Sequence, residues 1–173
     1  MAGLIHVYCG DGKGKTTAAM GLALRAAGSG KRVVVLQFSK DGKSSELGPL
    51  GQVPGIEVIP QTETFGFFWT LSPEEKTAAA AYYSGLLEKA FAEAENGCGL
   101  LVLDEAMSAC TNGFISEARL LDLLRQRPED LEVVLTGRGP SEQMLDAADY
   151  VTEMCKRKHP FEKGVPARKG IEF

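Results

Sequence analysis

Short apolar runs alternate with stretches of helical periodicity along this chain of 173 residues. Several runs are apolar at consecutive positions, as in RVVVLQF at 32–38, which is typical of strands buried on both faces. Because helical segments separate these runs, we predict an α/β fold in which helices flank a mostly parallel sheet. The strands are predicted at 4–9, 32–38, 56–59, 100–103, 133–136 and 150–153.

Capping residues divide the remaining sequence into helices. The segment SPEE at 72–75 combines an N-cap, a proline at the first helical position and a glutamate that completes a capping box. A long helix therefore begins there, and Asn96-Gly97 would end it near Glu95. Further helices are predicted at 16–27, 116–127 and 141–147.

A glycine-rich turn joins the first predicted strand to the first predicted helix. Its glycines allow successive N–H groups to approach an anion, and the helix directs its positive end toward the same point. In this pattern Lys15 reaches the terminal phosphates of a nucleoside triphosphate, and the Thr16 hydroxyl binds magnesium. Cys9 stands where the pattern has its first glycine, so a turn that binds nothing is the alternative. The turn reads Gly10-Asp11-Gly12-Lys13-Gly14-Lys15-Thr16-Thr17.

Composition fits one domain and excludes some partners. A net charge of −4 gives no bulk attraction to nucleic acid or to acidic membranes. No apolar run approaches the length of a membrane span, and no signal peptide is visible. The four cysteines have neither metal-ligand spacing nor a C-x-x-C motif, so we expect reduced thiols in a cytoplasmic protein.

Two acidic residues, Asp104 and Glu105, follow the strand predicted at 100–103. In phosphate-loop proteins such a strand lies beside the first one, and its acid stands near magnesium or orients a nucleophile. Successive side chains of a strand point opposite ways. We therefore expect one acid to face the metal and the other to anchor the edge of the sheet.

The segment PQTETFGFFWT at 60–70 gathers aromatic residues in a predicted loop. It holds three of the eight phenylalanines and the only tryptophan, an unusual density for a surface loop. One interpretation is a binding site for a large, flat apolar ligand. The other is that the rings fold back as core beneath the long helix, and the local sequence favours neither.

Cationic residues in two places offer contacts for anions. Arg138 follows a strand within TGRG at 136–139, and a planar guanidinium pairs well with phosphate. The alternative is a turn with a surface arginine. A cluster of lysines and arginines near the C-terminus is either a solvated tail or a contact for an anionic ligand. This cluster comprises Lys156, Arg157, Lys158, Lys163, Arg168 and Lys169.

Together these motifs resemble the ATP:corrinoid adenosyltransferases of the phosphate-loop type. The absent first glycine also fits, because the loop of this family lacks it. The resemblance implies a single P-loop NTPase-like (RecA-like) domain over 1–173, with a C-terminal active-site tail at about 156–173. The matching pieces are GDGKGKTTAA at 10–19, the strand end QF at 37–38, GFFW at 66–69, VLDE at 102–105, VVLTGRG at 133–139 and KHPFEKGVPARKGIEF at 158–173.

The resemblance implies transfer of the 5′-deoxyadenosyl group of ATP to Co(I) of a reduced corrinoid, cobalamin or cobinamide. Cobalt would attack the ribose 5′ carbon and triphosphate would leave, in adenosylcobalamin synthesis or corrinoid salvage. The protein then has to hold ATP, bring cobalt in line and neutralise the leaving group. A homodimer and a flavin-type reductase that supplies Co(I) are expected. Longer members carry an N-terminal covering segment, which we expect to be absent here or replaced by another part.

The same resemblance assigns roles to individual residues. Lys15, Thr16 and Glu105 would be catalytic, and Mg²⁺ (or Mn²⁺) would be held by Thr16 and Glu105, with Asp104 as the other candidate. Phe67 and Trp69 would form an aromatic wall that keeps water and the displaced axial base away from cobalt. The ATP-binding residues would be Gly10, Gly12, Lys13, Gly14, Lys15, Thr16, Thr17, Arg25 and Arg138.

Two other functions remain open at this point. A phosphate-loop kinase or ATPase would transfer the γ-phosphate instead, although the sequence contains no distinct arginine-rich lid. A non-catalytic nucleotide- or corrinoid-binding module would bind ATP without turnover.

Overall fold

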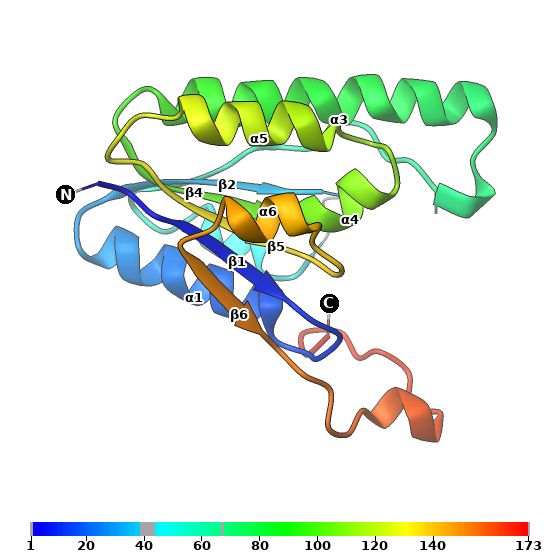
Figure 1. Ribbon diagram of the computed structural model, residues 1–173. Coiled ribbons are helices and arrows are strands. Elements are labelled where there is room, and N and C mark those ends of the chain that lie inside the picture. Colours follow the sequence, from blue (N-terminus) through cyan, green and yellow to red (C-terminus); the bar gives the residue numbers. More distant parts are fainter. Residues whose placement is uncertain (1, 39–43, 67, 173) are drawn as a thin grey trace.

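The computed structural model describes residues 2–38, 44–66 and 68–172. Within these ranges the chain forms one six-stranded sheet in the order β3-β2-β4-β5-β1-β6, and every neighbouring pair is parallel (Figure 1). The predicted α/β class and the predicted strands are confirmed, with ends that shift by up to two residues. The strands are β1 (Ile5–Cys9), β2 (Arg32–Gln37), β3 (Ile56–Val58), β4 (Cys98–Asp104), β5 (Glu132–Thr136) and β6 (Tyr150–Glu153).

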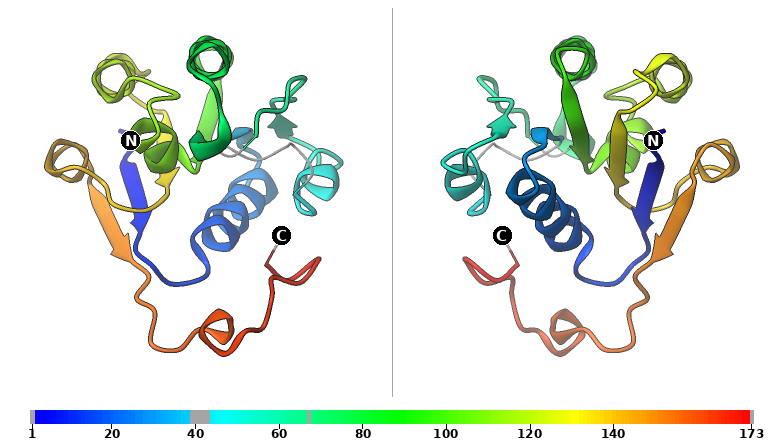
Figure 2. Two further views of the ribbon diagram at one scale, coloured as in Figure 1. Left: turned by 90° about the vertical axis from the view of Figure 1, so that its right-hand side faces the viewer. Right: turned by 90° about the vertical axis from the view of Figure 1, so that its left-hand side faces the viewer.

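Helices cover both faces of the sheet, as the alternating pattern predicts. The four predicted helices form, and Figure 2 shows α1 on one face with α3, α5 and α6 on the other. Their bounds are α1 (Lys15–Gly28), α3 (Pro73–Ala94), α5 (Glu117–Gln126) and α6 (Glu142–Asp146). Elements that the sequence did not predict are α2 (Leu47–Leu50), α4 (Ala106–Thr111) and the 3₁₀ turns η1 (Phe68–Thr70) and η2 (Pro160–Lys163).

Helix α3 begins with the capping box that its sequence predicts. The Glu75 N–H donates to the Ser72 hydroxyl at 3.2 Å, and the Ser72 N–H donates to the Glu75 carboxylate at 2.7 Å.

Among the described residues, no helix combines the length and the apolar character that a membrane span requires.

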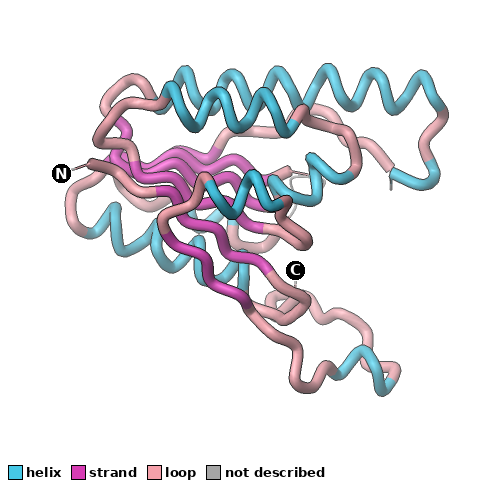
Figure 3. The backbone as a smooth tube through the Cα atoms, viewed as in Figure 1, coloured by secondary structure: helices cyan, strands magenta, loops and turns pink. Residues whose placement is uncertain are grey.

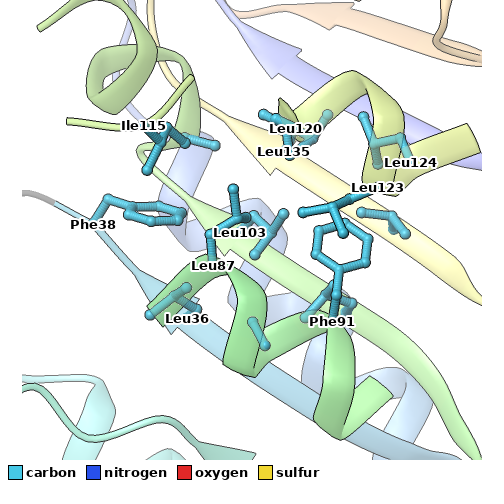
Figure 4. Packing of buried hydrophobic residues seen from close by; sticks show 14 of the residues in the cluster. Leu36, Phe38, Leu87, Phe91, Leu103, Ile115, Leu120, Leu123, Leu124 and Leu135 are labelled. Carbon is cyan, nitrogen blue, oxygen red and sulfur yellow. The ribbon is translucent and has the colours of Figure 1, made fainter. Parts of the chain in front are cut away.

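The core divides at the sheet because successive side chains of its central strands face opposite ways. Along β2, Val34 and Leu36 pack toward α3, whereas Val33 and Val35 pack toward α1. The larger half of the core joins β2 and β4 to α3 and α5, as Leu36, Leu87 and Leu103 show in Figure 4. This packing holds the strands in place. The phosphate loop and the polar residues Gln37, Asp104 and Thr136 lie at the carboxyl ends of these strands.

The strand order corrects one prediction. We expected the strand that ends at Asp104 to lie beside the first strand, but β5 lies between β4 and β1. Propensity and periodicity fix where strands form and not their order across a sheet, so this insertion was not visible in the sequence. As a result Thr136, the last residue of β5, lies between the phosphate loop and Asp104.

After β6 the chain leaves the sheet as a tail with little regular structure, which Figure 3 draws almost entirely as loop. The tail carries η2 and turns back, so that its end lies near the start of α1 (Figure 2). The basic cluster of the sequence thus lies on the same side of the molecule as the phosphate loop.

Candidate functional site

The phosphate loop makes its turn directly after β1. Gly10 and Gly14 have φ angles of 103° and 118°, which side chains disfavour. A Cβ atom at Gly10 or Gly12 would also lie 2.5 Å from the backbone oxygen of Met154. The Gly12 N–H donates to that same oxygen at 2.6 Å. Gly10 is therefore required both by the turn and by the close backbone approach, Gly14 by the turn, and Gly12 by the close approach.

Lys15 lies at the start of α1 with its ammonium group inside the loop. Its Nζ atom donates to the backbone oxygens of Gly10 and Gly12, both at 2.8 Å. Burial lowers the pKa of this lysine, the charge of Arg138 lowers it further, and Glu105 and Asp11 oppose the shift. Arg138 follows β5, the neighbour of β1, so Lys15 and Arg138, two predicted phosphate contacts, lie at the same edge of the sheet.

Asp104 is fully buried and is the centre of a hydrogen-bond network. Its Oδ2 atom accepts from the Thr16 hydroxyl at 3.2 Å and from Nε2 of Gln37 at 2.8 Å. Its Oδ1 atom accepts from the Thr136 hydroxyl at 2.6 Å. The carboxylate therefore joins the start of α1 to the ends of β2 and β5. Sequence reasoning identified Thr16 and Asp104 but missed Gln37 and Thr136, whose available signal was a polar residue at the end of a buried strand.

Glu105 leaves the strand in a different direction from Asp104. Its φ angle of 60° is the only positive value at a non-glycine residue in the described part of the chain. Its carboxylate accepts from the Ser108 hydroxyl at 2.5 Å, and its N–H donates to the Thr136 hydroxyl at 2.9 Å. Non-glycine residues in this backbone region often lie at functional sites.

The oxygen donors at this edge fit magnesium. The Thr16 hydroxyl and the Asp104 carboxylate are hard oxygen ligands, which Mg²⁺ prefers together with water and substrate phosphates. Among the described residues no group of three or more His, Cys, Asp or Glu side chains is arranged to hold a metal. A magnesium ion would thus need nucleotide and water to complete its coordination.

The aromatic segment at 60–70 was predicted either to bind a flat apolar ligand or to fold back as core, and its residues differ in which of these they fit. Phe65 packs on Tyr83 with ring centroids 5.9 Å apart, and Phe68 meets Phe114 edge-on at 5.6 Å. Both rings fold back against the core. Trp69, by contrast, exposes 76% of its surface. Phe67 lies outside the described residues.

Arg25 is not brought to the phosphate loop. It comes ten residues after Lys15 along α1, which is roughly 15 Å along a helix axis. It lines a cavity of about 340 Å³ with Lys31 and Glu132, at the end of the sheet opposite the loop. A nucleotide contact by Arg25 therefore stays a prediction without support from its position.

The C-terminal tail and the phosphate loop line an open pocket of about 640 Å³. The Lys156 N–H donates to the Asp11 carboxylate at 2.8 Å, and this hydrogen bond lowers the pKa of Asp11. Together with the bond from Gly12 to Met154, this contact holds the tail against the loop. The cationic residues that line the pocket are Lys13, Lys156, Arg157, Lys158 and Arg168.

Comparison with known proteins points to one family. Residues 1–173 match the family described as ATP:corrinoid adenosyltransferase BtuR/CobO/CobP. The chain is 35% identical over 176 residues to a corrinoid adenosyltransferase of Pseudomonas aeruginosa, covering 99% of this chain and 84% of that protein. It is 36% identical over 171 residues to corrinoid adenosyltransferase CobA of Salmonella typhimurium, covering 99% and 86%.

A solved structure supports the fold alone. The cytoplasmic domain of the Thermomonospora curvata type VII secretion ATPase EccC has a TM-score of 0.51 and 19% sequence identity. The match covers 94% of this chain, which spans about a fifth of that protein (21%).

Proposed function

Since the chain belongs to the ATP:corrinoid adenosyltransferase family, we propose that its phosphate loop grips the triphosphate of ATP as a leaving group. The enzyme transfers the adenosyl group of ATP to a corrinoid, in cobalamin biosynthesis or salvage. In the proposed reaction a cobalt–carbon bond forms at the ribose 5′ carbon. The carbon–oxygen bond to triphosphate breaks, and triphosphate leaves with its electron pair.

One observation carries this proposal for the site. The chain places a buried carboxylate, a helix start and two cations around one glycine-rich turn, at the carboxyl edge of a parallel sheet. Lys15 and Arg138 would neutralise the charge that develops on the leaving group, which is the task that remains when cobalt supplies the nucleophile. The loop N–H groups and the positive end of α1 add to the same field.

Magnesium is proposed to be held by Thr16 and Asp104, because these two side chains already meet. When bound, the ion would screen the phosphate charges and favour their departure as one group. Glu105 lies one residue further along and contributes a favourable charge to Lys15. We propose that Glu105 assists in orienting the hydrated ion, since its left-handed backbone turns it away from the strand.

Trp69 is proposed to form the corrinoid-facing wall, together with Phe67. An indole that exposes most of its surface in a segment at the carboxyl edge of the sheet can stack on a large, flat ring system. Such a wall would exclude water and the axial base from Co(II), which has to lose that ligand before reduction to Co(I). Phe65 and Phe68 would support the segment from beneath.

The tail at 156–172 is proposed to close over the triphosphate, since its cations share a pocket with the loop. Further proposals are a homodimer, a flavin-type reductase that supplies Co(I), and reaction in the cytoplasm. Four free cysteines fit the reducing compartment that Co(I) chemistry needs.

The test is incubation of the protein with ATP, Mg²⁺ and chemically reduced cobalamin. We expect the absorption spectrum of the cobalt–carbon product and one triphosphate for each product formed. Release of ADP and phosphate without the cobalt–carbon spectrum would instead support the γ-phosphate-transferring alternative. ATP binding without any product would support a binding module.

A further inference from the structure

We propose that Gln37 binds the nucleotide complex directly. In this proposal its amide nitrogen orients Asp104, and its amide oxygen accepts a hydrogen bond from an O–H donor of bound Mg·ATP. The inference rests on the proposed function only as far as ATP binding at the loop.

Gln37 occupies a central position at the catalytic edge. It is the last residue of β2, pairs in register with Asp104 at the end of β4, and exposes only 1% of its surface. Each polar atom of a buried glutamine needs a hydrogen-bond partner within the protein or a ligand, because bulk water cannot reach it.

The orientation of the amide is fixed by its neighbours. Nε2 donates to Asp104 Oδ2 at 2.8 Å and also lies 3.3 Å from Glu46 Oε1. Carboxylate oxygens accept hydrogen bonds and do not donate them when ionised. The NH₂ group therefore faces both acids, and the carbonyl oxygen has to point away from them.

That carbonyl oxygen is buried and has no hydrogen-bond partner among the described residues. The same is true of the amide oxygen of Gln61, whose nitrogen donates to the backbone oxygen of Gln37. A buried unpaired acceptor is costly, and most native proteins satisfy such groups. Two of them on residues that contact each other, beyond the carboxyl end of β2, indicate a site that is completed by a ligand.

The chemistry of that ligand follows from its neighbours. Asp104 Oδ2 accepts hydrogen bonds from both Gln37 Nε2 and the Thr16 hydroxyl. The Gln37 side chain is therefore bonded directly to one of the two proposed magnesium ligands, and its oxygen belongs to the same amide group. Two sources of an O–H donor exist there. One is a water retained by magnesium, which holds its hydration shell tightly, and the other is a ribose hydroxyl of ATP.

Two substitutions separate binding from structure. Gln37→Met keeps the volume but removes both the donor and the acceptor. Loss of the hydrogen bond to the buried Asp104 carboxylate should lower the urea midpoint of the free protein, and removal of the unpaired oxygen should offset part of that loss. Its Kd for Mg·ATP, measured by calorimetry without corrinoid, should rise about tenfold or more. The matched control is Gln143→Met on the exposed face of α6.

Gln37→Glu tests the donor separately and guards against failure of the first variant to fold. An ionised glutamate would face Asp104 and Glu46 and should bind Mg·ATP poorly at pH 8. Once protonated, it offers a donor and an acceptor as glutamine does. Its affinity relative to wild type should therefore recover as the pH falls toward 5, which a merely structural role would not produce.

Nucleotide analogues distinguish the two sources. If a ribose hydroxyl is the donor, Gln37→Met should lose less affinity for the deoxy analogue that lacks that hydroxyl than it loses for ATP, because only the orienting of Asp104 is then lost. If a magnesium-bound water is the donor, the loss should persist with the 2′- and 3′-deoxy analogues and should disappear when ATP binds without metal. Unchanged affinity of Gln37→Met for Mg·ATP would overturn the proposal, as would Gln37→Glu that does not recover at low pH. A wild-type chain that binds Mg·ATP but forms no cobalt–carbon product would refute the proposed function and leave Gln37 untouched.

Discussion

The hydroxyl of Thr136 donates to the buried carboxylate of Asp104 over 2.6 Å and accepts the backbone N–H of Glu105 at 2.9 Å. One side chain thus positions both acids that follow the predicted strand at 100–103. This contact spans 32 residues of sequence and exists because β5 lies between β4 and β1.

Replacing Thr136 with valine should destabilise the protein while keeping its shape. The change removes the donor to a fully buried carboxylate and the acceptor for a backbone N–H, so we expect a loss of about 1–3 kcal/mol in the free energy of unfolding. Urea denaturation measures it. Thr152→Val, at an exposed position of β6, is the control. Equal stability of the two variants would contradict the role given to Thr136.

Lys15→Ala should lower the rate at which ATP releases triphosphate in the reaction with pre-reduced corrinoid by about 100-fold or more, as removal of one preorganised charge does elsewhere. Lys89→Ala on the exposed face of α3 removes the same charge far from the loop and should leave the rate unchanged. The rate is followed by assaying triphosphate. A Lys15→Ala enzyme of near-normal rate would show that the leaving group is neutralised elsewhere.

The lowered pKa of Lys15 predicts a pH dependence of nucleotide binding. Burial favours the neutral amine in the free protein, whereas bound phosphates would favour the ammonium form. ATP binding should therefore take up protons at alkaline pH, and affinity should fall as the pH rises through the depressed pKa. Calorimetry in buffers of different ionisation enthalpy measures this uptake. The uptake should be absent from Lys15→Met, and its persistence there would assign it to another group.

Trp69→Ala should reduce activity that starts from Co(II) corrinoid more than activity that starts from chemically reduced Co(I). The proposed wall excludes the axial ligand, a task that is already complete when Co(I) is supplied. Stability should change little, because Trp69 exposes 76% of its surface. Leu24→Ala, on the exposed side of α1, is the control. Equal losses from both starting states would be inconsistent with a wall.

Replacement by alanine should have opposite effects on stability at two glycines, Gly21 in α1 and Gly10 in the phosphate loop. Gly21 lies within α1 with open space around it, so Gly21→Ala should raise the free energy of unfolding by about 1 kcal/mol. Gly10 has a φ of 103°, and an added Cβ would lie 2.5 Å from the Met154 oxygen. Gly10→Ala should therefore destabilise the loop and abolish ATP binding. Thermal unfolding and calorimetry check the pair.

The sequence predicted the elements that carry strong local signals. Strands with consecutive apolar residues and the helix capped by Ser72 formed close to their expected bounds. Helix α4 was missed because it follows β4 directly at Glu105, whose left-handed backbone provides no side-chain cap. Helix α2 spans four residues and contains a proline, so it has no helical periodicity to detect.

Candidate site residues could be predicted from the sequence where a single local motif contains them. The motif at 10–17 placed Lys15 and Thr16, and the acids after an apolar strand placed Asp104. Gln37 was noted only as part of a family match, because its contact with Asp104 crosses 67 residues and depends on the order of strands. Arg25 was assigned by resemblance alone, and its position on α1 does not support the assignment.

The neighbours of β1 have a consequence for the synthesis of the chain. The strand that leads into the phosphate loop is made long before its two neighbours, β5 at 132–136 and β6 at 150–153. Contacts of such long sequence separation form late and slow folding. On the ribosome, the nascent enzyme should therefore be unable to close its nucleotide site until β5 and β6 have emerged.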